Sequence, residues 1–406
     1  MEYFIMRNTF ILLIFTVLFT SCAQQRKITI VVTNDTEVAR SNETVSISWG
    51  QLLDNDPKLM DRNVVVADAK GYEVTSQIIR EGTKDPKGLI FQVTIPALST
   101  VQYTLKQRRP MVYPAHVFGR LVPERKDDFA WENDKVVYRV FGPAAEQEGE
   151  ICNGIDVWVK STDKLVINDW YRRGDFDKDR GDGFDGYEVG RTLGGGALAP
   201  YVNGRIYLGN NFSTSEILDQ GPLRLAFKLE YEPFHTESYE VTETRTISLD
   251  AHAYLTKIED VYENAPKGML VAAGIVTRPT PGDMWKDLER GISAYWEPEN
   301  NSNDTDNGHI GVGVIIPDGS REIVEKEGHL LNIAKYTKDK PFTYYIGSAW
   351  SKAGVRTPED WSNILILEHS KLDNPLLTEI RLEVVPSFSE RMKKIKDKIV
   401  AWWDKK

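Results

Sequence analysis

The stretch that decides the fold is residues 223–277, which holds four strand-like runs separated by turn residues: Leu223–Tyr231 (LRLAFKLEY), Thr242–Leu249 (TETRTISL), Tyr254–Tyr262 (YLTKIEDVY) and Met269–Thr277 (MLVAAGIVT). Short runs rich in β-branched and aromatic residues are typical of strands. The pattern continues from about residue 115 to 385, and no short repeat of fixed period favours a propeller or solenoid. We therefore predict an all-β protein whose larger part, residues 115–386, is a twisted two-sheet sandwich.

A smaller unit of the same kind precedes it. Residues 27–106 contain short β-branched runs such as Lys27–Thr33 and Leu89–Ile95, again separated by turn residues. This spacing predicts a small antiparallel sandwich. No cluster of reactive side chains occurs there, so we interpret it as a spacer or packing unit. Gln107–Pro114 has the composition of a linker.

Two helices are expected in the last 50 residues. Thr357–Asp360 (TPED) combines an N-cap, an early proline and early acids, which predicts a helix to about Leu372. Residues 387–406 predict a C-terminal amphipathic helix opened by Ser389, with lysines on one face. Its apolar stripe consists of Met392, Ile395, Ile399 and Trp402. We expect the stripe to dock on the sandwich, and contact with a membrane surface is the alternative.

The N-terminus resembles an export signal. Arg7 precedes the apolar run Phe10–Phe19, which is too short to span a bilayer, and Ser21 is followed by Cys22. We predict a lipoprotein signal peptide over residues 1–21, a lipid on Cys22 and a tether over residues 22–26. An ordinary cleaved signal with a chance cysteine is the alternative. The residues after Cys22 lack an acidic run, so we expect a periplasm-facing anchor in the outer membrane.

Charge and cysteine content narrow the possible partners. The net charge is −10, which argues against a general nucleic-acid binder, although a local arginine cluster can still attract an anionic ligand. With Cys22 lipidated, only Cys152 remains, so no internal disulfide can form. Cys152 is expected to be a buried small hydrophobe.

One stretch concentrates chemistry without any apolar period: Trp170–Gly196 (WYRRGDFDKDRGDGFDGYEVGRTLGGG). Such a segment is typical of a functional loop on a rigid scaffold, and we interpret it as presenting a sugar. Its alternating aspartates could surround calcium. However, Arg180 takes the place of the turn glycine of an EF-hand and Gly186 that of the closing glutamate. We therefore expect no cofactor, with calcium as the less favoured alternative.

A second dense stretch is His116–Asp134. Arginines bind carboxylates through two parallel bonds, and tryptophan offers an apolar face to a sugar ring. Its residues Arg120, Arg125, Trp131 and Glu132 therefore suit an acidic sugar. The equally weighted alternative is an internal ion-pair network with Trp131 in the core. Absence of HExxH and GxSxG motifs argues against a zinc site and an α/β-hydrolase serine.

Several motifs resemble one family in order: Arg120–Asp134 (RLVPERKDDFAWEND), Asn153–Lys160 (NGIDVWVK), Gly181–Gly194 (GDGFDGYEVGRTLG), Gly221–Tyr231 (GPLRLAFKLEY) and Ile247–Asp250 (ISLD). The family is domain of unknown function 4861, from Bacteroidetes polysaccharide-utilisation systems. The resemblance implies a small N-terminal β-sandwich followed by a galactose-mutarotase-like supersandwich. It also implies an oligosaccharide dehydratase that removes water from a terminal glucuronic or iduronic acid of ulvan fragments and leaves a 4,5-unsaturated uronate.

Such an elimination needs a group that neutralises the carboxylate, a base and an acid. We predict Arg120 or Arg125 as the neutralising group and His116 or Tyr187 for proton transfer. The residues expected to bind the substrate are Trp131, Glu132, Trp170, Arg172, Asp182 and Arg191.

Two other functions stay open. A glycoside hydrolase would need two carboxylates about 5–9.5 Å apart, which Glu132 with Asp182 or Asp185 could supply. A non-catalytic glycan-binding lipoprotein would bind an acidic oligosaccharide and leave it unchanged.

Overall fold

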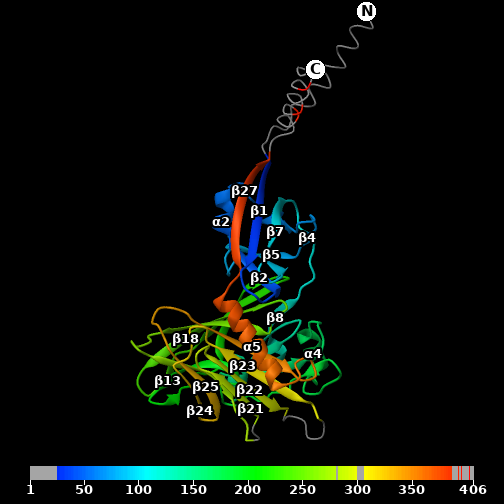
Figure 1. Cartoon of the computed structure of the whole chain (residues 1–406). Helices are drawn as coiled ribbons and strands as arrows, with labels where there is room; N and C mark the ends of the chain where they lie inside the picture. Colours follow the sequence, from blue (N-terminus) through cyan, green and yellow to red (C-terminus); the bar gives the residue numbers. More distant parts are fainter. Residues whose placement is uncertain are drawn as a thin grey trace, which may run out of the picture.

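The computed structural model describes residues 25–279, 282–299 and 306–385, together with Met392, Ile395 and Trp402. Two β-built units lie one above the other (Figure 1). The predicted signal peptide and Cys22 lie outside the described residues, as does Ile399. Met392, Ile395 and Trp402 are helical and 47%, 49% and 53% exposed, and the docking of the apolar stripe on the sandwich stays a prediction. No described helix is long and apolar enough to cross a membrane.

The smaller unit is a sandwich of two sheets with strand orders β27-β1-β7-β3-β4 and β2-β6-β5. Its elements are β1 (Gln25–Asn34), β2 (Arg40–Ser48), α2 (Trp49–Asn55), η1 (Asp61–Asn63), β3 (Val64–Ala67), β4 (Glu73–Val74), β5 (Ser76–Ile79), β6 (Gly88–Ile95) and β7 (Ser99–Gln107). Alternating apolar side chains such as Ile28, Ile30 and Val32 on β1 fill the space between the sheets.

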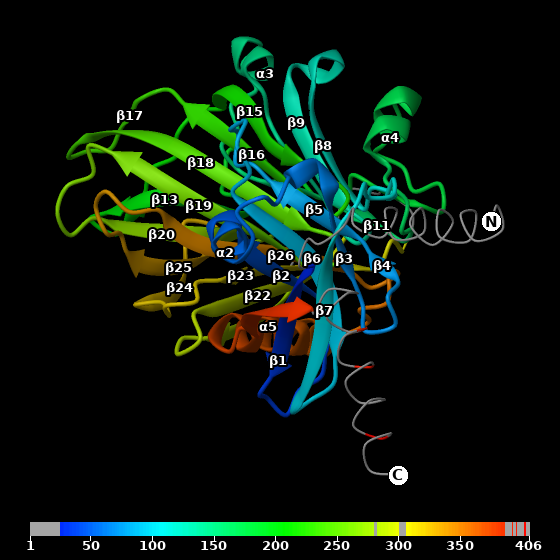
Figure 2. The same ribbon diagram turned by 90° about the horizontal axis from the view of Figure 1, so that it is seen from above.

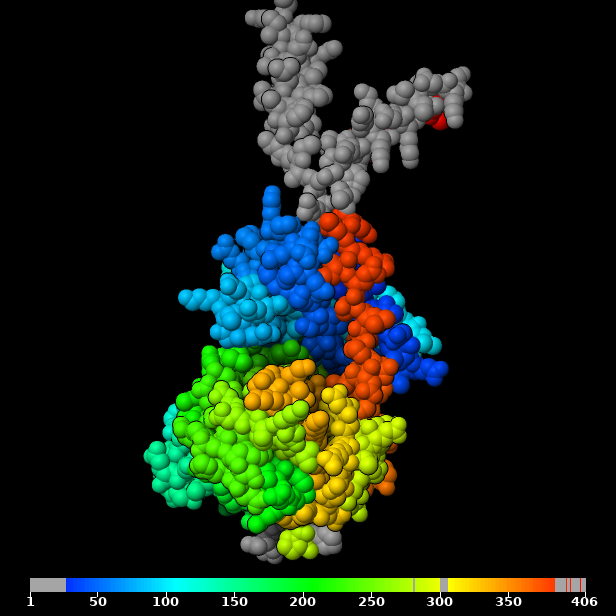
Figure 3. All heavy atoms as spheres, turned by 90° about the vertical axis from the view of Figure 1, so that its left-hand side faces the viewer, coloured from blue at the N-terminus to red at the C-terminus, as the bar shows by residue number. Residues whose placement is uncertain are grey.

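The last strand of this unit comes from the far end of the chain. β27 (Leu377–Val385) pairs antiparallel with β1, with Thr33 opposite Leu377 and Gln25 opposite Val385. Figure 3 shows β27 in orange-red along the side of the small unit. The sequence predicts this strand as part of the larger unit, residues 115–386, and that prediction is wrong. Apolar alternation identifies a strand but carries no information about its partner.

The larger unit contains three sheets, with strand orders β12-β11-β10-β9-β8, β14-β13-β20-β25-β24 and β15-β16-β18-β19-β26-β23-β22-β21. The first two are joined by a parallel bridge between Ile155 and Gly194. One continuous core packs side chains of all three sheets together, among them Trp131, Leu198 and Ile247. This architecture confirms the predicted all-β sandwich fold.

The strands of the larger unit are β8 (Val117–Val122), β9 (Asp128–Asn133), β10 (Val137–Val140), β11 (Asp156–Lys160), β12 (Gly183–Phe184), β13 (Gly195–Val202), β14 (Arg205–Ile206), β15 (Phe212–Gln220), β16 (Arg224–Tyr231), β17 (Phe234–His235), β18 (Glu240–Asp250), β19 (Leu255–Glu263), β20 (Leu270–Val276), β21 (Asp283–Asp287), β22 (Ile292–Pro298), β23 (His309–Ile315), β24 (Glu322–Lys326), β25 (His329–Lys335) and β26 (Phe342–Trp350). Its helices are η2 (Pro123–Arg125), α3 (Pro143–Gln147), α4 (Ile167–Arg173) and α5 (Pro358–Asp373).

Helices α4 and α5 cover different outer faces of the larger unit (Figure 2). The helix predicted after Thr357 is confirmed as α5, and Thr357 and Asp360 cap each other's backbone at its start. Trp361 of α5 packs over Gly311, Gly313 and Gly347, where a Cβ atom would meet its ring at 3.0–3.2 Å. Helix α4 was not predicted, because it has only seven residues and its last four, Trp170–Arg173, begin the stretch without an apolar period.

Candidate functional site

A cavity of about 320 Å³ opens on the side of the larger unit. We call it the side hollow. It lies between the β9–β10 turn, the end of β11, the β18–β19 turn and the end of β26. Its lining residues are Asp134, Lys135, Trp158, Val159, Lys160, Ser161, Thr162, Asp163, Tyr254, Ser348, Ala349, Trp350, Lys352 and Ala353. The hollow therefore combines aromatic rings, cations and two carboxylates in a volume suited to a small ligand.

Two of its lysines lie over aromatic rings. The Lys135 ammonium is 4.6 Å from the centre of the Tyr254 ring, and the Lys352 ammonium is 5.8 Å from that of Trp350. Lys352 also donates to the backbone oxygen of Asp306 at 2.6 Å. Within the described part of the chain neither ammonium group forms an ion pair with a carboxylate. Both therefore retain charge that an anionic ligand could neutralise.

The third lysine is paired. Lys160 Nζ is buried and donates to Glu132 Oε2 at 3.1 Å. Glu132 also accepts the backbone N–H groups of Val166 and Ile167, both at 2.8 Å, at the start of α4. The carboxylate oxygens of Glu132 are thus occupied by one ion pair and one helix start. We interpret Glu132 as a structural group that holds α4 against β9.

Asp134 is the carboxylate that the fold fixes at the edge of the hollow. His252 donates from its backbone N–H to Asp134 Oδ1 at 2.7 Å, and its ring Nδ1 lies 2.9 Å from Oδ2. Burial opposes ionisation, but the bonds from His252 outweigh it and lower the pKa of Asp134. Asp134 is therefore ionised at neutral pH, whereas Asp163, on the other lining segment, is exposed to solvent.

The side chain of Asn133 explains why the chain turns here. Its Oδ1 accepts the backbone N–H groups of Lys135 and Val136 at 2.7 and 2.9 Å, which is the bonding of an asparagine-led turn. Its Nδ2 donates to the oxygens of Asp250 and Ala253 at 2.8 and 2.7 Å. One buried amide therefore ties the β9–β10 turn to the β18–β19 turn and brings Asp134 to His252.

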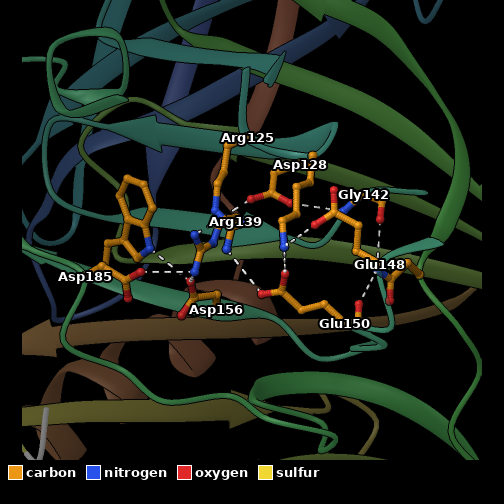
Figure 4. Close-up of polar contacts among 11 residues, drawn as sticks. Arg125, Asp128, Arg139, Gly142, Glu148, Glu150, Asp156 and Asp185 are labelled. Atoms are coloured by element: carbon orange, nitrogen blue, oxygen red, sulfur yellow. Dashed lines mark hydrogen bonds and ion pairs between the residues drawn. The ribbon is translucent and has the colours of Figure 1, made fainter. Parts of the chain in front are cut away.

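A second charged group lies sealed beneath α4. Arg139 Nη2 is 2.5 Å from Asp156 Oδ2 and 3.0 Å from Asp185 Oδ2, and Nη1 is 3.8 Å from Asp128 Oδ2 (Figure 4). We call these four residues the Arg139 cluster. Asp128, Arg139 and Asp156 share a sheet face because alternate residues of β9, β10 and β11 point away from the core, and Asp185 follows directly after β12. The guanidinium also lies over the rings of Phe141 and Trp158, at 4.8 and 5.2 Å.

Burial shapes the protonation of this cluster. It raises the pKa of Asp128 to about 6, although the charge of Arg139 opposes the rise. Burial also raises the pKa of Asp185, and the nearby Asp156 charge adds to this effect. Three carboxylates around one guanidinium cannot all ionise without cost, so a proton is expected to remain within the Arg139 cluster near neutral pH.

A much smaller cavity, of about 10 Å³, lies where the loop after β12 meets the end of β22. Glu297 Oε2 accepts a bond from Arg278 Nε at 2.9 Å, and burial raises the pKa of Glu297 to about 7. The Arg278 guanidinium lies 4.8 Å from the centre of the Tyr187 ring. This space is large enough for a water molecule and too small for a sugar.

The four residues predicted to be catalytic have separate partners within the protein. His116 lies against the His252 ring, with centroids 5.1 Å apart. Arg120 pairs with Glu124 and donates to Asn168, whereas Arg125 pairs with Glu150. Tyr187 is buried and donates to the oxygen of Gly194 at 3.2 Å. None of the four lines the side hollow.

The predicted substrate-binding residues are mostly engaged inside the protein. Trp131 and Trp170 are fully buried, and their indole N–H groups donate to Thr256 and Asp182. Their rings are therefore not available to a sugar, and the core placement weighed as the alternative for Trp131 is the one observed. Arg172, which is exposed, pairs with Asp169, and Asp182 also pairs with Arg173.

Arg191, the last of the predicted substrate-binding residues, donates to the backbone oxygen of Gly209 at 2.8 Å. The aspartates of the Trp170–Gly196 stretch likewise have separate partners. Asp175 pairs with Arg180, and Asp179 accepts the backbone N–H groups of Gly181 and Gly183. Over the described ranges, no three histidine, cysteine or acidic side chains converge as metal ligands.

The side hollow was largely missed from the sequence. Asp134 ends one of the two dense stretches, and an Asn-Asp-Lys triplet between strand runs signals a turn, so its place at a loop could have been found. Tyr254, Trp350 and Lys352 come from segments more than 90 residues further on. Nothing in their local sequence separates them from ordinary strand ends.

An all-β sandwich with a charged, aromatic-lined hollow is the class of protein that these observations define. The chain belongs to the family described as a domain of unknown function (DUF4861), whose model matches residues 32–377. It is 28% identical over 394 residues to "Uncharacterized protein P7" of Formosa agariphila, in an alignment that covers 90% of this chain and 96% of that protein. The predicted family membership is confirmed.

Similar solved structures include an α-mannosidase from Enterococcus faecalis, with a TM-score of 0.50 and 9% identity over 89% of this chain. A glycosyl hydrolase family 38 protein from the same organism has a TM-score of 0.49 and 11% identity over 88% of the chain. The chain spans about half the length of these proteins, 46% and 49% respectively. At this identity the first likeness shows the fold.

The predicted dehydratase activity is contradicted. The finding against it is that the solved structure sharing the fold is described as an α-mannosidase, and no comparison points to a lyase. In addition, Arg120, Arg125 and Tyr187 bind three different protein groups, His116 lies against His252, and none of the four lines either of the two cavities described above. The physical reason is that the dense stretches of charge are used for internal bonding.

Proposed function

We propose that this chain is a carbohydrate-active enzyme of the glycoside hydrolase class that acts on acidic oligosaccharides, with the side hollow as its sugar-binding site. The hollow is the observation that carries the proposal. Its volume of about 320 Å³ suits one or two sugar rings, and it presents both apolar and polar surface. The fold shared with an α-mannosidase supports the same class.

The charges of the hollow favour an acidic sugar. Lys135 and Lys352 point at aromatic rings and lack carboxylate partners within the described residues. A carboxylate or sulfate on the sugar would supply the missing counter-charge, in surroundings less polar than water where the attraction is stronger. Tyr254 and Trp350 are the rings nearest those lysines and would border the sugar.

Two carboxylates of the hollow provide the chemistry that hydrolysis needs. Asp134 is ionised, so it suits the role of base or nucleophile, and Asp163, the other carboxylate of the lining, is the candidate for the second carboxyl group that hydrolysis needs. The sequence suggested a different pair of carboxylates, Glu132 together with Asp182 or Asp185. Asp134 and Asp163 take the place of that pair. Glu132 is bound to Lys160 and α4, and Asp185 is bound within the Arg139 cluster.

The test is hydrolysis of a matched panel of neutral, uronate-containing and sulfated oligosaccharides. We expect reducing ends to be released from the acidic members, and we expect Asp134→Asn and Asp163→Asn to lower the rate while thermal stability is retained. Glu263→Gln, which lies outside the hollow, is the matched control. Binding to the panel without release of any reducing end would overturn the hydrolase and favour a glycan-binding protein.

We also propose that a lipid on Cys22 anchors the protein to the outer membrane, facing the periplasm. The sequence around Ser21 and Cys22 supports this. Strand β1 begins at Gln25, inside the predicted tether of residues 22–26, so the folded chain starts close to the proposed lipid site. Labelling with a radioactive fatty acid is expected for the native chain and not for Cys22→Ala. Equal labelling of both proteins, or of neither, would contradict the anchor.

A further inference from the structure

We infer that His252 is the positioning residue of Asp134, holding this carboxylate in one orientation at the edge of the side hollow. The kinetic part of this inference rests on the proposed function, whereas the structural part does not. His252 contributes two donors to the two oxygens of the same carboxylate, at 2.7 and 2.9 Å. No other described side chain does this for a carboxylate that lines the hollow.

The backbone of His252 is specialised for this contact. Its φ angle is +64°, in the left-handed region that residues with a Cβ atom rarely adopt. The surrounding turn is held in place from both sides, because Asn133 Nδ2 donates to Asp250 and Ala253, and Gln92 Nε2 donates to the oxygen of Ala251 at 2.8 Å. Residues in strained backbone conformations that the surrounding structure holds in place are often found at functional sites.

The bonding also determines the tautomer of the His252 imidazole. Because Asp134 is ionised, ring Nδ1 must carry the hydrogen that it donates to Oδ2. The charged and titratable groups around the pair are Lys135 on the same turn, Lys160 on β11 and His116 before β8, whose ring lies against that of His252. The remaining lone pairs of Asp134 are left for a ligand or a water molecule.

This arrangement has a defined consequence for catalysis. A carboxylate with one fixed orientation presents the same lone pair at each turnover, and its charge is maintained by donors that need not reorganise. Without the ring, Asp134 would keep only the backbone bond and could rotate. We therefore expect His252 to affect kcat and the pH profile more than KM.

The test substitutes His252→Gly, which removes the ring and leaves φ of +64° unstrained. Asn264→Gly is the matched control, because Asn264 has a φ of +60° in another turn of the same unit. The first measurement is the ¹³C NMR titration of the Asp134 carboxyl group, with Asp134→Asn to assign the signal. We expect its pKa to rise in His252→Gly and to stay unchanged in Asn264→Gly.

The second measurement is the pH profile of kcat/KM on the hydrolysed oligosaccharide. We expect about a tenfold loss in His252→Gly, an acid limb moved to higher pH, and partial rescue by added imidazole. An Asp134 titration that is the same in folded His252→Gly as in the native chain would overturn the inference. If no oligosaccharide is hydrolysed, the proposed function fails, and the NMR titration still decides the role of His252.

Discussion

The side hollow and the Arg139 cluster contain the same kinds of residue and use them in opposite ways. In the Arg139 cluster, three aspartates surround one buried guanidinium beneath α4. In the hollow, Lys135 and Lys352 lie on aromatic rings beside Asp134, open to a cavity. The difference shows that density of charge along a sequence does not by itself indicate a binding site. What matters is whether the charges are matched within the protein.

The largest effect on stability is expected from removing the cation of the Arg139 cluster. Arg139→Met would leave Asp128, Asp156 and Asp185 buried without their cation, which should cost about 3–5 kcal/mol of unfolding free energy. Urea unfolding measures the change. Arg172→Met is the control, because Arg172 is exposed and pairs only with Asp169 among the described residues. Equal losses in both variants would show that the Arg139 cluster does not stabilise the fold.

The pH dependence of stability should also come from the Arg139 cluster. Burial raises the pKa of Asp128 from 3.8 to about 6, so its neutral form is favoured in the folded state. Its contribution is fully present below about pH 4 and is lost as the pH rises through 6, by about 3 kcal/mol at most. Asp128→Asn should remove this part of the slope. Urea unfolding at several pH values between 4 and 7 measures it.

Other carboxylates titrate in the same range, so the quantity to compare is the difference between native and variant proteins at each pH. Asp163→Asn is a suitable control, because Asp163 is exposed and lies outside the Arg139 cluster. A native chain that loses no stability relative to Asp128→Asn between pH 4 and 7 would contradict a protonated carboxyl group in this cluster.

Substitutions in the side hollow should change ligand binding and have little effect on the free energy of unfolding. Replacing Lys135 and Lys352 together by glutamine should weaken binding of an acidic oligosaccharide about tenfold, because two cations that face the cavity are lost. Isothermal titration calorimetry at two salt concentrations measures this. Binding of a neutral oligosaccharide serves as the control. A similar loss for both ligands would mean that the lysines do not select for charge.

The comparison also explains what the sequence could predict. Strand runs such as Leu223–Tyr231 and the cap at Thr357 are local signals, and they correctly predicted the all-β fold and α5. The partner of β27 depends on pairing across more than 340 residues, which local patterns do not encode. The side hollow was not predicted for the same reason. Asp134 is held in one orientation by His252, and no sequence pattern around either residue predicts that contact.

The smallest effect is expected at the rim of the sealed region. Arg173 pairs with Asp182 at 3.3 Å, and its side chain is 29% exposed. Water competes for such a pair, so Arg173→Gln should cost less than about 1 kcal/mol in urea unfolding. Asp182 would retain its bond from the Trp170 indole at 3.1 Å. A cost as large as that of Arg139→Met would mean that this partly exposed ion pair stabilises the loop between α4 and β12 as strongly as the buried Arg139 cluster does. Burial would then not explain the difference between the Arg139 cluster and the side hollow.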